Sequence, residues 1–157
     1  MQVTAEIRPG EIVTETPVRA DASVEFIGRI HTPWASPREC PRKGDLNGPV
    51  CRVEIFAPWD QALKSIEKQS HLQILYWMHL ARRDLLVQCP RHASVSSGTF
   101  ALRSPNRPNP IAASFVELVA VEGNMLLVKG LDCVDGTPLI DVKPENCPHA
   151  TPRSVDP

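Results

Sequence analysis

Proline is the feature that most restricts what this chain can fold into. It supplies 16 of the 157 residues, about twice its usual share. Each proline fixes its own φ, removes a backbone N–H and disfavours helix in the residue before it. Long helices therefore cannot dominate. Hydrophobic residues make up 42% of the chain and charged residues 22%, which is typical of a packed domain, and the length predicts a single domain of ordinary size.

The apolar pattern predicts a mostly β fold, a single small domain with one or two short helices, built as a β-barrel-like structure or as a sheet covered on each side. Residues 113–121 and 125–130 flank Glu122-Gly123-Asn124 and predict a hairpin. Both of its strands are apolar on nearly both faces, which suits either a barrel or a sheet covered on each side. Residues 60–68 carry the only convincing helix signals. Further strands are predicted at residues 24–30, 51–56, 71–79, 98–102 and 138–142, with a short one around Ile12 and Val13.

The segments between these elements predict the domain organisation. Residues 1–20 read as an N-terminal arm, residues 21–147 as the barrel-like domain and residues 148–157 as a C-terminal tail. Residues 32–50 contain four prolines and two glycines and predict a long irregular loop, of the kind that often carries function. Residues 81–98 read as a second loop.

Charge and targeting signals narrow the function classes. The net charge of −1 excludes a histone-like polycation, and no apolar run approaches the 18 residues of a membrane-spanning helix. We therefore predict no membrane partner. The N-terminus carries no secretory signal pattern, and five cysteines at irregular spacing favour reduced thiols in a cytoplasmic protein. Residues 82–107 hold five arginines against one aspartate, which indicates either a solvated loop or a surface for a polyanion.

Several common chemistries find no support. The chain lacks a glycine-rich nucleotide loop and a nucleophile elbow. Cys89 and His92 lie close in sequence, as do Cys147 and His149, but no CxxC pair is present. Structural zinc sites usually use such pairs, so we predict no metal site.

Two segments carry dense polar chemistry. Residues 103–110, RSPNRPNP, combine a backbone held rigid by proline with guanidinium and carboxamide groups, which indicates either a stiff surface loop or a preorganised binding segment. Residues 131–138, LDCVDGTP, place two carboxylates three residues apart before a glycine–threonine–proline turn. This segment is either a plain turn or a ligand-binding loop.

The two segments in this order resemble one family. GTFALRSPNRPNPIAAS followed by LVAVEGNMLLVKGLDCVDGTPLIDVKP is similar to the TrmO (YaeB/TsaA-like) family of tRNA N6-threonylcarbamoyladenosine methyltransferases, and the resemblance extends over residues 24–147. It implies a non-Rossmann, β-barrel methyltransferase that uses S-adenosyl-L-methionine to methylate N6 of threonylcarbamoyladenosine at position 37 of tRNA. It also implies a homodimer with the cofactor close to the subunit interface.

The resemblance also implies a set of cofactor-binding residues. Asp132 or Asp135 would balance the sulfonium and ammonium charges of the cofactor or hold its ribose, and Arg103 would pair with its carboxylate. The implied cofactor-binding residues are Pro41, Arg42, Lys43, His79, Leu80, Arg103, Ala113, Asp132, Val134, Asp135, Gly136 and Thr137.

Two further roles are tRNA binding and removal of the proton from N6. The predicted phosphate-binding residues are Arg82, Arg83, Arg91 and Arg107, because phosphate contacts dominate affinity for nucleic acid. Asp135 and Asn109 are the predicted catalytic residues, as acceptors near N6. Lys43, Leu80 and Ala113 depart from the usual family pattern. Two alternatives therefore stay open: a non-catalytic cofactor- or RNA-binding module of the same fold, and a methyltransferase for another small acceptor.

Overall fold

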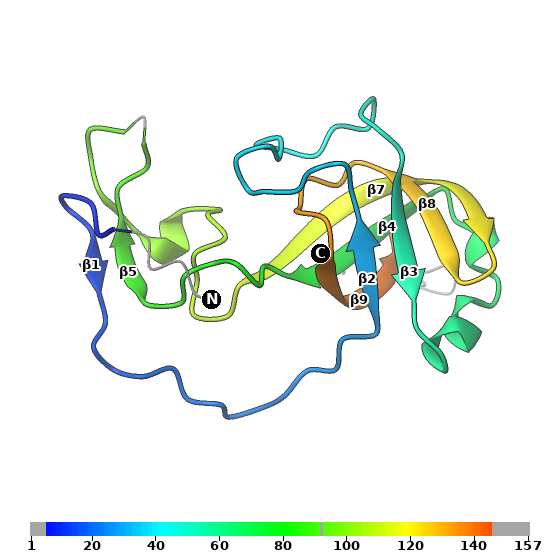
Figure 1. The fold of residues 1–157 in the computed structure, drawn as a ribbon, viewed down its shortest axis with the longest axis horizontal. Coiled ribbons are helices and arrows are strands. Elements are labelled where there is room, and N and C mark those ends of the chain that lie inside the picture. The colour runs from blue at the N-terminus through cyan, green and yellow to red at the C-terminus, as the bar shows by residue number, and fades with distance from the viewer. Residues whose placement is uncertain (1–5, 92, 146–157) are drawn as a thin grey trace, which may run out of the picture.

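A six-stranded closed barrel forms most of the molecule (Figure 1). The computed structural model describes residues 6–91 and 93–145. Every neighbouring pair of barrel strands is antiparallel. In spatial order the strands are β2 (Gly28–His31), β3 (Cys51–Ile55), β8 (Met125–Lys129), β7 (Ile111–Glu122), β4 (His71–Trp77) and β9 (Thr137–Pro144). This architecture confirms the predicted mostly β, barrel-like fold.

Alternating side chains give the barrel its buried interior. Cys51, Val53 and Ile55 of β3 point inward and are buried, while the residues between them are more exposed. β4 and β8 follow the same period of two, as expected of strands with one face on a core. The hairpin of β7 and β8 forms where it was predicted, but the outer face of β7 keeps Ile111 and Phe115 exposed.

The predicted helix over residues 60–68 forms as two short 3₁₀ helices, η1 (Trp59–Leu63) and η2 (Ile66–Lys68). Ser65 lies between them with a φ of 71°. Because that left-handed conformation cannot continue a right-handed helix, the segment breaks there. The predicted short helical content is confirmed, whereas the single continuous helix is wrong.

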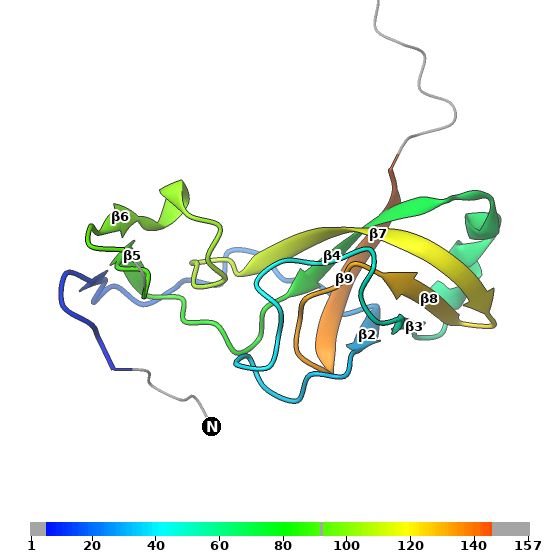
Figure 2. The same cartoon turned by 90° about the horizontal axis from the view of Figure 1, so that it is seen from above.

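A small second sheet lies beside the barrel (Figures 1 and 2). It consists of β1 (Ile12–Val13), β5 (Leu85–Gln88) and β6 (Ser97–Gly98), and it carries the 3₁₀ helix η3 (Thr99–Ala101). We call residues 6–14 and 82–108 the lobe. The short strand of the arm is confirmed, but reading residues 81–98 as a loop was wrong, because Leu85 and Gln88 are buried and β5 pairs with strands on both sides.

Two further strand predictions need correction, and one segment cannot be compared. The first barrel strand begins only at Gly28, and most of residues 98–102 adopts the turn of η3 rather than a strand. Residues 15–26 form an exposed link from the lobe to β2. The proposed C-terminal tail, residues 148–157, lies outside the described residues.

Barrel topology decides which loops meet. Because neighbouring strands run in opposite directions, one barrel end collects the ends of β2, β8 and β4 and the starts of β3, β7 and β9. We call this the site end. It gathers the loop of residues 32–50, the segment after β4, the proline-rich segment before β7 and the loop of residues 130–136. All segments implied to bind cofactor therefore emerge from, or lead into, this end.

Candidate functional site

The loop of residues 32–50 crosses the loop of residues 130–136 at two glycines. A Cβ on Gly44 would lie 1.9 Å from the carbonyl oxygen of Gly130. Gly130 itself has a φ of +113°, a conformation that favours glycine. The contact fixes the Pro41-Arg42-Lys43 stretch beside the start of the loop of residues 130–136, which we call the acidic loop after Asp132 and Asp135. Two of the segments implied by sequence are therefore in direct contact.

Asp132 is held by a partly buried chain of hydrogen bonds that passes through Tyr76. The Tyr76 hydroxyl donates to Asp132 Oδ1 over 2.8 Å, and because its single proton is used there, it accepts from Ser114 Oγ, also at 2.8 Å. Burial raises the pKa of Tyr76 well above its ordinary value, and the nearby Asp132 charge adds to the shift. Tyr76 therefore stays protonated and serves as a fixed donor. Asp132 lies half-buried at the mouth of the barrel interior.

Replacing Tyr76 with phenylalanine is expected to lower the free energy of unfolding by about 1–3 kcal/mol, the usual cost of an unsatisfied buried polar group. Urea denaturation measures this change. Ser114→Ala is the matched comparison and should cost less, because Asp132 keeps its bond from Tyr76. Equal stability of the wild-type and Tyr76→Phe proteins would contradict the assigned chain.

The turn after Asp132 is built mainly by backbone hydrogen bonds. Asp135 N donates to the Trp34 carbonyl and Gly136 N to the Ile30 carbonyl, both over 2.8 Å. Thr137 is 1% exposed, and its hydroxyl donates to the Val134 carbonyl over 2.6 Å. The Thr137 side chain is thus structural, whereas the Asp135 side chain is 51% exposed and available to a ligand.

Three thiols lie close to this turn. Burial raises the pKa of Cys51 to about 11 and that of Cys133 to about 12. Burial also raises the pKa of Cys40, with the Asp132 and Glu39 charges adding to it. All three stay protonated near neutral pH. Within residues 6–91 and 93–145, no group of three or more His, Cys, Asp or Glu side chains is arranged for a metal ion. His92, Cys147 and His149 lie outside the described residues.

The end of β4 joins the proline-rich segment to the barrel. Met78 N donates to the Pro110 carbonyl over 2.8 Å, so His79 and Leu80 follow directly from this junction. Burial lowers the pKa of His79, which favours a neutral imidazole, and Leu80 is 59% exposed. Ala113 lies on the outer face of β7, opposite Leu75.

Arg103 lies on the lobe, away from the acidic residues at the site end of the barrel. It lines a cavity of about 330 Å³ together with Arg8 and Arg91, and lobe residues alone supply the walls. Within the described part of the chain, Arg91 and Arg103 make no hydrogen bond or ion pair. A single subunit therefore places Arg103 and the loop of residues 130–136 in separate surroundings.

Three of the four predicted phosphate-binding arginines have partners within the fold. Arg83 Nε donates to the Pro108 carbonyl over 2.6 Å, and its guanidinium lies 5.3 Å from the Trp77 ring centroid. Arg107 Nη1 donates to the Leu102 carbonyl over 2.6 Å, and Arg82 pairs with Asp84 at 2.7 Å. Arg83 and Arg107 thus hold the proline-rich segment in shape.

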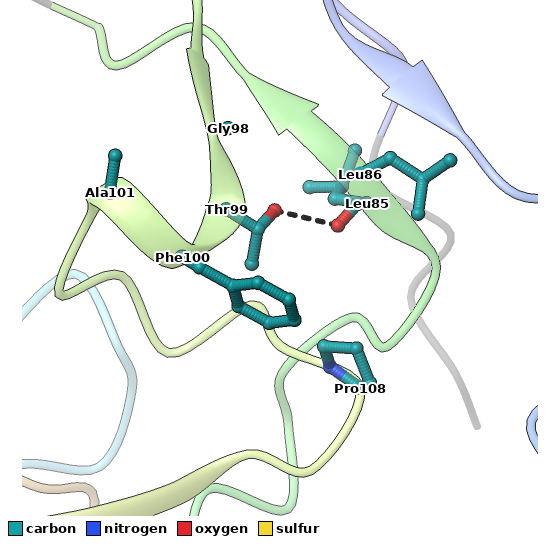
Figure 3. Close-up of a pocket in the computed structure, with 7 residues that line it drawn as sticks. All are labelled: Leu85, Leu86, Gly98, Thr99, Phe100, Ala101 and Pro108. Atoms are coloured by element: carbon teal, nitrogen blue, oxygen red, sulfur yellow. Dashed lines mark hydrogen bonds between the residues drawn. The ribbon is translucent and has the colours of Figure 1, made fainter.

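A shallow apolar hollow of about 170 Å³ marks the lobe (Figure 3). Thr99 donates to the Leu85 carbonyl over 2.6 Å, which seats η3 on β5. Phe100 is 82% exposed beside Pro108. The lining residues are Leu85, Leu86, Gly98, Thr99, Phe100, Ala101 and Pro108.

Comparison with known proteins gives one consistent family. The model of the tRNA-methyltransferase O N-terminal domain matches residues 29–147. The probable S-adenosyl-L-methionine-binding protein VirR of Rhizobium radiobacter is 46% identical over 142 residues, which are 90% of this chain and 81% of that protein. The tRNA (adenine(37)-N6)-methyltransferase of Rattus norvegicus is 34% identical over 68% of this chain, but the match covers 25% of the rat protein.

Solved structures agree with the sequence relatives. The crystal structure of TrmO from Pseudomonas aeruginosa superposes with a TM-score of 0.63 at 36% identity, over 78% of this chain. The matched region covers 54% of the solved chain, so this chain spans about half the length of that protein. No helix among the described residues is long and apolar enough to cross a membrane.

Proposed function

This chain belongs to the TrmO family, and from that premise we propose that it methylates N6 of threonylcarbamoyladenosine at position 37 of tRNA, with S-adenosyl-L-methionine as methyl donor. One observation carries the proposal. Barrel closure brings the loop of residues 32–50, the end of β4 and the loop of residues 130–136 to the same end. These are the segments that the family resemblance assigns to the cofactor.

The side chains at the site end suit the cofactor's charges. When bound, S-adenosyl-L-methionine supplies an electrophilic methyl group on a cationic sulfur. Asp132, fixed by Tyr76, would offer a carboxylate to the ammonium or ribose, and backbone groups near Leu80, Ala113 and Val134 would read the adenine edge. Since methyl transfer disperses charge, the protein mainly needs to hold donor and acceptor in line.

The position of Arg103 supports a homodimer with shared sites. Arg103 lines a lobe cavity that lacks any residue of the acidic loop, so a cofactor carboxylate held by Arg103 would belong to a cofactor on the partner subunit. Exposed apolar side chains on the lobe and on β7, Phe100 and Phe115 among them, offer surface for such an interface. Arg91, exposed and unpaired within the described residues, is the best placed arginine for a tRNA phosphate.

The direct test is methyl transfer from labelled S-adenosyl-L-methionine to tRNA that carries threonylcarbamoyladenosine at position 37. Label on this tRNA and none on tRNA without the threonylcarbamoyl group is the expected result. Calorimetric titration with the cofactor runs in parallel and should give a dissociation constant below about 1 mM. Cofactor binding without label transfer to tRNA would favour the binding-module alternative, while transfer to a metabolite extract would favour another acceptor.

The shared site is tested by mixing two inactive variants, Arg103→Ala and Asp132→Asn. If each site takes Asp132 from one subunit and Arg103 from the other, randomly paired dimers should regain about a quarter of the wild-type rate, because roughly half are mixed and each mixed dimer keeps one intact site. Mixed dimers that regain no activity would place both residues in one subunit. A monomer by sedimentation would reject the homodimer.

A further inference from the structure

His31 lies between two carboxylates, Glu54 on β3 and Asp135 on the acidic loop. His31 Nε2 lies 2.8 Å from Glu54 Oε2, and His31 Nδ1 lies 3.8 Å from Asp135 Oδ1. The register of β2 and β3 pairs Arg29 with Glu54 and His31 with Arg52. His31 and Glu54 are therefore diagonal neighbours on the outer face of the barrel, where such side chains meet.

The hydrogen bonds set the orientation of the imidazole. A carboxylate only accepts, so Glu54 holds a proton on His31 Nε2 and leaves the Nδ1 lone pair facing Asp135. Asp135 Oδ1 also accepts the backbone N–H of Thr32, over 3.0 Å. The Nδ1 lone pair and Asp135 Oδ1 are thus two acceptors separated by a gap of 3.8 Å, and neither can donate to the other.

This gap has the dimensions of a site for one donor. An N–H group about 2.9 Å from each acceptor, the usual hydrogen-bond distance, fits between atoms 3.8 Å apart. The two side chains are 28% and 51% exposed, so a ligand can reach them. Both atoms can therefore accept a hydrogen bond from a ligand N–H group at the turn of residues 132–137.

Resting on the proposed function, we propose that His31 is the base that takes the N6 proton, with Asp135 sharing that N–H and Glu54 as the positioning residue for His31. The N6 lone pair forms the new N–C bond while the S–C bond breaks, and its electron pair stays on sulfur as a neutral thioether. The N6 proton passes to His31 Nδ1. Solvent then takes it from the partly exposed ring.

The surroundings stabilise the imidazolium that this step creates. A carboxylate lies beside each ring nitrogen, Glu54 at Nε2 and Asp135 at Nδ1, so both N–H groups of the protonated ring face an acceptor. Arg52, opposite His31 on β3, and Arg29, opposite Glu54 on β2, are the other charged residues around His31 on this outer face. Asn109 is the other acceptor predicted from the sequence. Its side chain is a neutral amide, which is a poor base.

The test compares His31→Gln with the wild type in single-turnover methyl transfer at saturating cofactor. We expect the rate to fall by about a hundredfold, the usual loss of a general base, with the calorimetric dissociation constant of the cofactor within about twofold. Imidazole added to His31→Ala should restore part of the rate. Glu54→Gln should cost about tenfold, and Glu67→Gln, the same change on the exposed helix η2 at the opposite barrel end, is the matched control.

Two results would overturn the assignment of His31. One is a His31→Gln rate within threefold of the wild type. The other is a rate loss fully matched by lost cofactor affinity and not rescued by imidazole, since that pattern belongs to a residue with only a structural role. A wild-type protein that binds no cofactor, or transfers no label to tRNA, would instead reject the proposed function itself.

Discussion

An Asp132→Asn variant is expected to lose about a hundredfold in cofactor affinity while its barrel stays folded. Asparagine keeps an oxygen that accepts the Tyr76 hydroxyl, which donates to Asp132 over 2.8 Å. What it removes is the negative charge at the barrel mouth. Truncating a partly buried, hydrogen-bonded charge that faces an opposite charge typically costs about 2–5 kcal/mol of binding free energy.

Calorimetry with S-adenosyl-L-methionine measures the affinity, and urea denaturation checks the fold. Asp21→Asn is the matched control, because Asp21 lies in the exposed link of residues 15–26, which leads to the start of β2 at the barrel end opposite the site end. It should bind the cofactor as the wild type does. Unchanged affinity in Asp132→Asn would show that the acidic loop does not hold the cofactor.

A Gly44→Ala variant is expected to displace the loop of residues 32–50 and weaken cofactor binding by more than about tenfold. The added methyl group would start 1.9 Å from the Gly130 carbonyl oxygen, far inside van der Waals contact. Both atoms belong to backbone, so a side-chain rotation cannot relieve the overlap. A displacement of about 1 Å at a binding site is enough for losses of this size.

The matched control is Gly98→Ala, whose new Cβ would meet nothing within 4 Å. Thermal unfolding should separate a local change from a global one, because the barrel core lies beneath the displaced loop and does not include Gly44. A Gly44→Ala protein that binds the cofactor like the wild type would mean that this crossing of loops plays no part in the site.

Local sequence patterns predicted much of the barrel. The β7–β8 hairpin follows from a turn flanked by two apolar runs, and β3 and β4 follow from their β-branched and aromatic residues. β5 escaped prediction because its four residues follow two arginines and an aspartate, and are too few to show a period. The break at Ser65 depends on a backbone conformation that residue type does not reveal.

The site was predictable only where several polar and charged residues follow one another closely in the sequence. The segments of residues 103–110 and 131–138 stand out by themselves, but Tyr76, His31 and Glu54 do not. Tyr76 meets Asp132 across a separation of 56 residues, and His31 meets Glu54 across 23. Such meetings result from barrel closure and strand register, which no local window contains. The single tyrosine of the chain, in the buried phase of a predicted strand, was the one available signal for this chain of hydrogen bonds.

Closure of the barrel also bears on how such a protein can change over evolution. Each of its six strands pairs with a neighbour on either side, so insertion, deletion or substitution in the connecting loops uncovers no sheet edge that would invite aggregation. The scaffold is thus insulated from the loops that carry the chemistry. Substitutions in those loops can therefore change which molecule binds at the site end, while the pairing of the barrel strands stays the same.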